Sequence, residues 1–158
     1  MMTVFDYQAR IIERTAASLA YWLQMTAPDR VNWKPTVEGS APTRSAIEQI
    51  QECIRVNRTF AAKLSGHEPD HGNAPAELTS EEAQQQLISS AKELAAVVRG
   101  LDEDSLSRDY TLSWGTLPGL ILIELAVANM SYHGGQINLI QLLYGDEKFH
   151  VNPDFFNM

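Results

Sequence analysis

Three polar side chains interrupt the most apolar stretch of the chain. The stretch covers residues 117–145, and at helical spacing its stripe carries Asn129, His133 and Gln136 in the middle. Burying such groups without partners would cost roughly 1–3 kcal/mol each, so they must meet other polar groups, water or an ion. The interruption therefore predicts the place of a functional site, although it does not indicate a reaction.

A second set of candidate residues is a literal H-E-x-x-H, the spacing of a zinc-protease motif, from His67 to His71. That chemistry needs both histidines on one face of a helix. Pro69 lies in the middle of the segment, with Gly66 and Gly72 at its ends. These residues favour turns over helix, so the segment is predicted to be a solvated loop.

The single cysteine, Cys53, excludes an internal disulfide framework and fits a reducing compartment. Its neighbour Glu52 would raise the pKa of the thiol, which argues against a reactive nucleophile. A buried, structural cysteine is the expected state. We therefore predict a cytoplasmic protein.

The amino-acid composition limits the classes of partner that the protein can bind. The 158 residues are 44% apolar and 20% charged, as expected of one globular domain spanning residues 1–158. Twelve Lys and Arg against twenty Asp and Glu give a net charge of −8, without any basic cluster. This charge argues against nucleic acid and anionic membranes as partners. The longest apolar run, residues 117–127, contains Glu124 and is too short to span a bilayer.

Three predicted helices begin at capping boxes, in which a Ser or Thr and an acid three residues later cap each other. The boxes open residues 3–25, 45–64 and 79–101, where apolar residues recur at steps of three and four. A fourth helix is predicted over residues 116–145, with Thr116 as its N-cap. Phe149 and two later phenylalanines indicate that the irregular tail packs on the remainder of the chain.

An irregular crossover, residues 30–43, connects the first two helices, and no segment shows the alternation of a strand. The predicted fold is all-α, a four-helix bundle with a long crossover between helices 1 and 2.

Gly134 and Gly135 each cost about 1 kcal/mol relative to alanine inside a helix. We therefore expect a neighbouring helix or a partner subunit to approach closely there.

Three short motifs of the chain are similar to those of a known superfamily. His133-Gly-Gly-Gln136-Ile137 resembles the H-x-G-Q-I signature in the last helix of the DinB/YfiT-like superfamily. Residues 32–35 with the Ser45 capping box resemble its lead into the second helix, and residues 56–60 its stretch after the first metal ligand. The resemblance covers nearly the whole chain. It implies a four-helix bundle, often dimeric, and in many members a divalent metal held by three histidines.

The resemblance carries that metal site onto Glu52, Asn129 and His133, of which only His133 keeps the histidine of the pattern. A one-residue shift would place Cys53 at the first position; three flanking matches favour Glu52. Gln136 and Cys53 are expected in the adjoining pocket. A Glu/Asn/His set favours Mn²⁺- or Mg²⁺-like ions over tightly held Zn²⁺ or Ni²⁺, or no metal. In the metal-free alternative, Glu52 accepts a hydrogen bond from His133 within a buried polar network.

Two function classes follow from the resemblance. The replaced ligands favour a dimeric, metal-free or weakly metal-binding protein that takes a small molecule and is related to stress. The alternative is a divalent-metal-dependent thiol transferase or isomerase acting on a small electrophilic substrate. There an ion at the replaced triad would polarise a thiol or water. The expected partners are a second copy of the chain and a small-molecule or thiol ligand.

Overall fold

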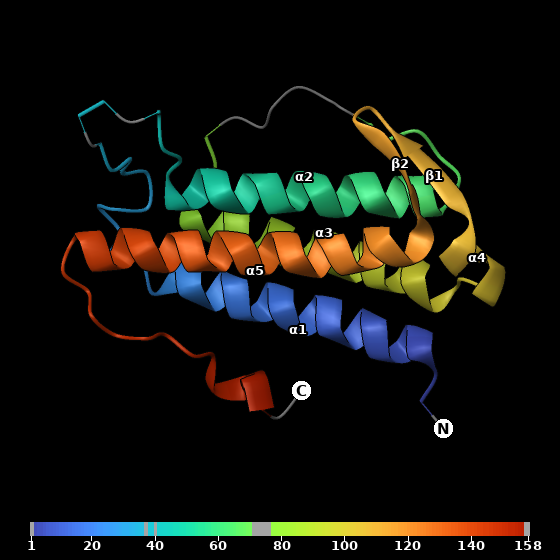
Figure 1. Cartoon of the computed structure of the whole chain (residues 1–158). Helices are drawn as coiled ribbons and strands as arrows, with labels where there is room; N and C mark the ends of the chain where they lie inside the picture. The colour runs from blue at the N-terminus through green and yellow to red at the C-terminus, as the bar shows by residue number, and fades with distance from the viewer. Residues whose placement is uncertain (1, 37, 40, 71–76, 157–158) are drawn as a thin grey trace.

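The structure, a computed structural model, describes residues 2–36, 38–39, 41–70 and 77–156. Four long helices run side by side and form an all-α bundle, as predicted (Figure 1). The elements are α1 (Val4–Gln24), α2 (Ala46–Leu64), α3 (Ser80–Arg99), α4 (Glu103–Ser107), β1 (Asp109–Leu112), β2 (Gly115–Pro118), α5 (Gly119–Leu143) and the 3₁₀ turn η1 (Pro153–Phe156). The long crossover connects α1 to α2, as expected.

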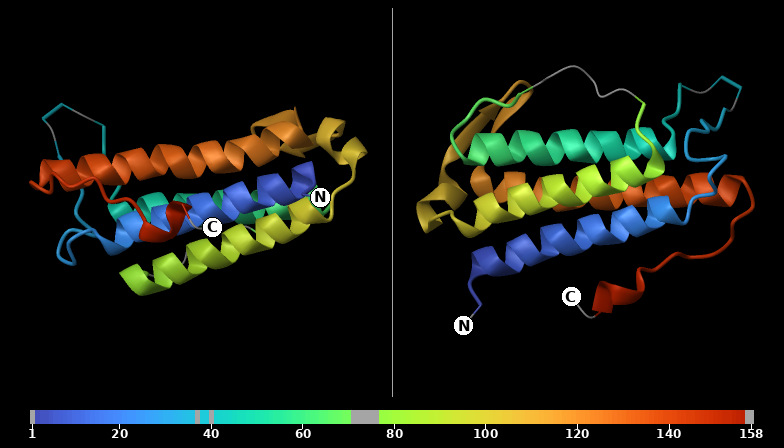
Figure 2. Two further views of the ribbon diagram at one scale, coloured as in Figure 1. Left: turned by 90° about the horizontal axis from the view of Figure 1, so that it is seen from below. Right: turned by 180° about the vertical axis from the view of Figure 1, so that it is seen from behind.

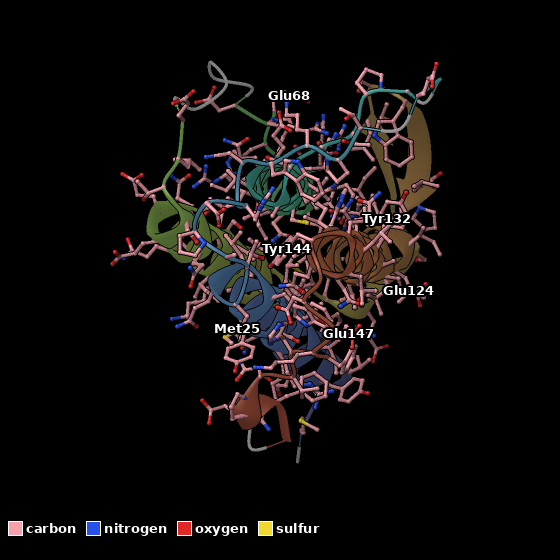
Figure 3. The ribbon with its side chains drawn as sticks, turned by 90° about the vertical axis from the view of Figure 1, so that its left-hand side faces the viewer. Met25, Glu68, Glu124, Tyr132, Tyr144 and Glu147 are labelled. Carbon is pink, nitrogen blue, oxygen red and sulfur yellow. The ribbon has the colours of Figure 1, made fainter. Side chains whose placement is uncertain are left out.

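Seen along their axes, the four long helices surround one core (Figure 3). α1 packs on α3 and α5, and α2 packs on the same two helices, so that α3 and α5 lie at opposite corners. The largest fully buried apolar side chains come from all four helices: Ile12, Leu23, Ile50, Leu87, Leu94, Val98, Leu122, Ile123, Met130 and Ile137. Within the part of the chain that the structure describes, no helix has the length and apolar content needed to cross a bilayer.

The three predicted capping boxes are present at the starts of α1, α2 and α3. At α1, for example, the Asp6 N–H donates to Thr3 Oγ1 at 3.0 Å, and the Thr3 N–H donates to the Asp6 carboxylate at 3.1 Å. Each box satisfies N–H groups that a helix start leaves without partners. α5 differs, because its N-cap is Pro118 and no side chain caps it.

The prediction of a strand-free chain with Thr116 as an N-cap is wrong for residues 109–118. β1 and β2 form an antiparallel hairpin that lies across one end of α2 and α5 (Figure 1). Tyr110 and Leu112 are buried, whereas the alternating Asp109 and Thr111 are exposed. Strands of four residues are too short for their alternation to stand out in the sequence.

One glycine is required by close packing. A Cβ on Gly119, at the start of α5, would lie 2.2 Å from the backbone oxygen of Ser105. By contrast, a Cβ on Gly134 would meet only Leu19 Cδ1, at 3.7 Å, and one on Gly135 would meet no atom within 4 Å. The close approach of a neighbouring helix that we expected at Gly134 and Gly135 is therefore not found. A partner subunit at that place remains a prediction.

The C-terminal tail packs on α1, as its aromatic residues predicted (Figure 2). The ring of Phe149 meets Trp22 edge-on, with 5.0 Å between centroids, and the Asn152 amide donates to the backbone oxygen of Ala17 at 3.3 Å. The ring of Trp33, in the crossover, meets that of Tyr144 edge-on, with 6.4 Å between centroids. The tail thus ties the end of α5 to α1.

Candidate functional site

The polar interruption of α5 is built around a buried histidine. His133 is 4% exposed, and its Nδ1–H donates to Oε1 of Gln136 at 2.7 Å and to Oε1 of Gln49 on α2. Both partners are carbonyl oxygens, so the ring carries its proton on Nδ1 and keeps the lone pair on Nε2. In the described part of the chain, Nε2 has no hydrogen-bond partner.

Burial lowers the pKa of the His133 imidazole below its ordinary value of 6.5. The hydrogen bond to Gln136 and the negative charge of Glu52 act in the opposite direction, whereas Arg44 acts with burial. The imidazole is therefore neutral at pH 7. A neutral ring is the form that binds a metal ion or accepts a proton from a ligand.

Glu52 lies at the edge of the α2 stripe and is held by arginines. Its carboxylate accepts a hydrogen bond from Arg55 Nη2 at 2.6 Å, and Arg44 Nη1 lies 3.8 Å away. The hydrogen bond considered between Glu52 and His133 is not formed, because Gln49 takes that place. The negative charge of Glu52 is thus already compensated.

A hollow of about 250 Å³ lies between α2, α5 and the turn of the hairpin. Its lining residues are Glu52, Arg55, Val56, Thr59, Phe60, Trp114, Leu125 and Asn129. The fold therefore brings two of the predicted residues, Glu52 and Asn129, to one wall, although they are far apart in the sequence. His133 and Gln136 do not line the hollow, and Cys53 is fully buried in the core.

Asn129 carries the least satisfied group of the site. Its Oδ1 is buried and has no hydrogen-bond partner among the described residues. A buried acceptor without a donor costs about 1–3 kcal/mol, so native proteins keep such atoms mainly where water, an ion or a ligand supplies the donor. Among the described residues, three other buried atoms are unpaired in the same way, Asn57 Oδ1, Tyr110 Oη and Gln141 Oε1, and Asn129 is the one of these four residues that lines the hollow.

The substitution Asn129→Leu is expected to stabilise the protein by roughly 1 kcal/mol, because it removes the buried acceptor and keeps the side-chain volume similar. Urea denaturation would measure the change. Asn129→Asp is the control, since it keeps the acceptor and adds a charge, and it should give no gain. A leucine variant less stable than the wild type would contradict the assignment of Oδ1 as unsatisfied.

Cys53 behaves as the sequence predicted. Burial raises the pKa of its thiol, and the carboxylate of Glu52 raises it further. The thiol is therefore protonated at pH 7 and is not a nucleophile.

His67 is exposed, and its backbone N–H donates to the oxygen of Ala62 at 2.9 Å, past the end of α2. The H-E-x-x-H segment is thus not helical at its first histidine; His71 lies outside the described residues.

The donor set does not fit a tightly held metal ion. No group of three or more His, Cys, Asp and Glu side chains gathers within the described residues. The predicted set consists of one imidazole, one neutral amide oxygen and the Glu52 carboxylate, which is bound to Arg55. A cation at Glu52 would compete with that guanidinium and be repelled by Arg44.

Gln49 is the residue of the site that the sequence analysis missed. It lies one turn before Cys53 on the buried side of α2 and is 4% exposed. A glutamine within an apolar stripe is the same signal that led to His133 on α5, so the pattern of α2 already contained it. Asn57, further along the stripe, donates to Ser90 Oγ at 3.2 Å in a second buried polar contact.

Comparisons with known proteins agree with the fold. The sequence model of the DinB superfamily matches residues 11–137. The chain also resembles the crystal structure of the DinB-like protein YjoA from Bacillus subtilis, with a TM-score of 0.71 and 16% identity. That match covers 92% of this chain and 99% of the other. No curated protein matches the chain.

Proposed function

Since the chain belongs to the DinB superfamily, we propose that it is a small-molecule-binding member that holds a divalent metal ion weakly or not at all. One observation carries the proposal: Asn129, whose side-chain oxygen is buried and unpaired among the described residues, is one of the residues that line a hollow of about 250 Å³. A bound molecule that reaches this oxygen would supply the donor that the described residues do not. The apolar side chains in the lining of the hollow, Val56, Phe60, Trp114 and Leu125, suit an organic ligand.

The charges around Glu52 support the metal-free part of the proposal. Metal sites use carboxylates whose negative charge is available to the ion. Here Arg55 and Arg44 both lie within 4 Å of the carboxylate, on its two oxygens. A single imidazole, His133, cannot replace the three that bind Zn²⁺ or Ni²⁺ tightly.

Protein purified without a chelator or a histidine tag is expected to contain well under one equivalent of any transition metal. Its unfolding temperature should also be the same with and without EDTA, because no ion contributes to the folded state. Elemental analysis and a thermal melt measure the two quantities. Stoichiometric metal in the wild type that is lost on His133→Ala would overturn this proposal.

Stoichiometric metal that is lost on His133→Ala would favour the alternative function, a divalent-metal-dependent thiol transferase or isomerase. The observation on its side is the orientation of His133. Metal-binding histidines commonly donate one N–H to an oxygen acceptor and bind the ion through the other nitrogen. His133 has this arrangement, with Nδ1–H on Gln49 and Gln136 and Nε2 free of protein partners in the described chain.

We also propose that the protein is a homodimer that associates through the outer face of α5. Glu124 is the one charged residue in the 25 residues of this helix. Figure 3 shows Glu124 and Tyr132 on the side of α5 that faces away from α3. The exposed large side chains of the helix are Leu120, Tyr132, Leu139, Leu142 and Leu143. Large apolar side chains that are exposed together on one face of a helix are normally covered, and Gly135 leaves room there for a partner.

The variant Leu139→Glu/Leu142→Glu is expected to be monomeric, because two charges would be buried in the interface. Light scattering at micromolar concentration should give about twice 17.6 kDa for the wild type and 17.6 kDa for the variant. Tyr7→Glu, which places an acid at an exposed aromatic position on α1, is the matched control and should remain dimeric. A monomeric wild type would refute the dimer without affecting the ligand proposal.

A further inference from the structure

A second hollow lies between α1, α5 and the C-terminal tail. It measures about 360 Å³ and shares no lining residue with the hollow beside Asn129. We propose that it binds a neutral, largely apolar organic molecule, at a site separate from that of the proposed function. Three features support this: an uncharged lining, two glycines that packing within the chain does not require, and a tail that narrows the groove.

The described residues that line this hollow carry no charge. α1 supplies Leu19 and Trp22, α5 supplies Met130, and the tail supplies Phe149 and Phe155. The other lining residues are two glycines and uncharged polar side chains. A charged ligand would lose part of its hydration here without meeting an opposite charge in the lining. A neutral ligand would gain free energy by covering the apolar side chains.

Gly134 and Gly135 lie next to each other in the wall that α5 contributes. A Cβ on Gly134 would meet only Leu19 Cδ1, at 3.7 Å, and one on Gly135 would meet no atom within 4 Å. Glycine inside a helix is destabilising relative to alanine, and packing within the chain does not require it at either position. A ligand that lies on the bare backbone would account for a wall without side chains, because glycine permits close approach to the backbone.

The tail narrows the groove between α1 and α5 (Figure 2). Phe149 packs edge-on against Trp22, and the guanidinium of Arg14, outside the lining, lies 4.6 Å from the ring centre of Phe155. A single helical turn, about 10 Å wide and 5.4 Å long, occupies roughly 400 Å³. A second copy on the outer face of α5 would therefore border the hollow without placing a helix in it. Pockets for drug-sized ligands measure roughly 300–1,000 Å³, a range that includes this hollow.

The three tryptophans of the chain allow the site to be tested in the wild-type protein. Trp22 lines this hollow, Trp114 lines the hollow beside Asn129, and Trp33 lines neither. Their indole N–H resonances in ¹H–¹⁵N spectra, assigned by single Trp→Phe variants, report on the two hollows separately. The probes are 2-naphthol, which is neutral, the anion 2-naphthalenesulfonate and the cation 2-naphthylmethylammonium.

We expect 2-naphthol to shift the Trp22 resonance with a Kd of about 1 mM, as suits a fragment of its size. Both charged probes should bind about tenfold more weakly, because the lining offers them no counter-charge. Equal binding of either charged probe would overturn the neutrality. Tighter binding of the cation would do the same and would identify the aromatic rings as a cation site.

Two variants fill the hollow from opposite walls, Gly134→Leu on α5 and Ser18→Leu on α1. Both should weaken the binding of 2-naphthol at Trp22 at least tenfold, and urea denaturation checks that they remain folded. Ala128→Leu is the matched control, since it adds the same side chain at an exposed position of α5 outside the lining, and it should bind like the wild type.

Unchanged affinity in both filled variants, or a probe that shifts Trp114 and not Trp22, would overturn the second site. A wild-type dimer that becomes monomeric in Gly134→Leu would show that a second copy fills the hollow, and would overturn the ligand. The proposed function fails on a different result, stoichiometric metal in the purified protein, so the two failures are distinguishable.

Discussion

Replacing Glu52 and Asn129 together by histidine is expected to create a tight Zn²⁺ or Ni²⁺ site. Both positions line one hollow, and His133 follows Asn129 by four residues, about one helical turn. Three imidazoles suit these ions far better than a carboxylate, an amide and one imidazole. The oxygens of Gln49 and Gln136 already accept the Nδ1–H of His133, and metal-binding histidines are commonly oriented by such a hydrogen bond.

Dialysis followed by elemental analysis measures the effect, which should rise from well under one equivalent in the wild type to one equivalent in Glu52→His/Asn129→His. The control is Cys53→His/Asn129→His. Cys53 is fully buried in the core, so a histidine there should destabilise the bundle and bind no metal. If this control captures metal and the Glu52 variant does not, the alignment of α2 with the family is off by one residue.

Gly119→Ala is expected to lower the free energy of unfolding by about 3 kcal/mol, at the upper end of the range for overpacking. The new Cβ would lie 2.2 Å from the backbone oxygen of Ser105 and 2.9 Å from the ring of Tyr110. A backbone oxygen cannot rotate away as a side chain can, so α4 and the start of α5 must separate. Urea denaturation measures the loss.

Gly134→Ala is the matched control for that experiment. Its Cβ meets only Leu19 Cδ1, at an ordinary contact distance of 3.7 Å. Alanine should therefore raise the stability by roughly 0.5–1 kcal/mol through its better helix propensity. A Gly119→Ala protein as stable as the wild type would show that the contact with Ser105 does not constrain position 119.

The four long helices could be predicted from the sequence, whereas the hairpin could not. The reason is that the helices are long and the strands are short. The capping boxes at Thr3, Ser45 and Thr79 are local signals, and each is followed by about five turns of regular periodicity. The strands around Trp114 have four residues each and are held by contacts with α2 and α5. Such tertiary contacts override local propensity and leave no local signal.

The site could be located from the sequence only in part. The predicted stripe through Asn129, His133 and Gln136 lies on the turns of α5 that carry the buried histidine and one wall of the hollow. The buried line, however, runs through Met130, His133 and Ile137, and Asn129 and Gln136 lie at its margins. Partners on α2 depend on how the two helices are rotated against each other. Helical phase within either sequence does not contain that rotation, so the contact between Gln49 and His133 could not be predicted.

The unequal starts of the helices have a consequence for the order of folding. α1, α2 and α3 each carry their own capping box and can begin to form from local interactions. α5 has no side-chain cap and contains Gly134 and Gly135 near its middle, so it depends on docking against the others. We therefore expect its docking to be the late kinetic step. Until then the hollow does not exist, and a ligand that binds there slows unfolding by resisting the release of α5.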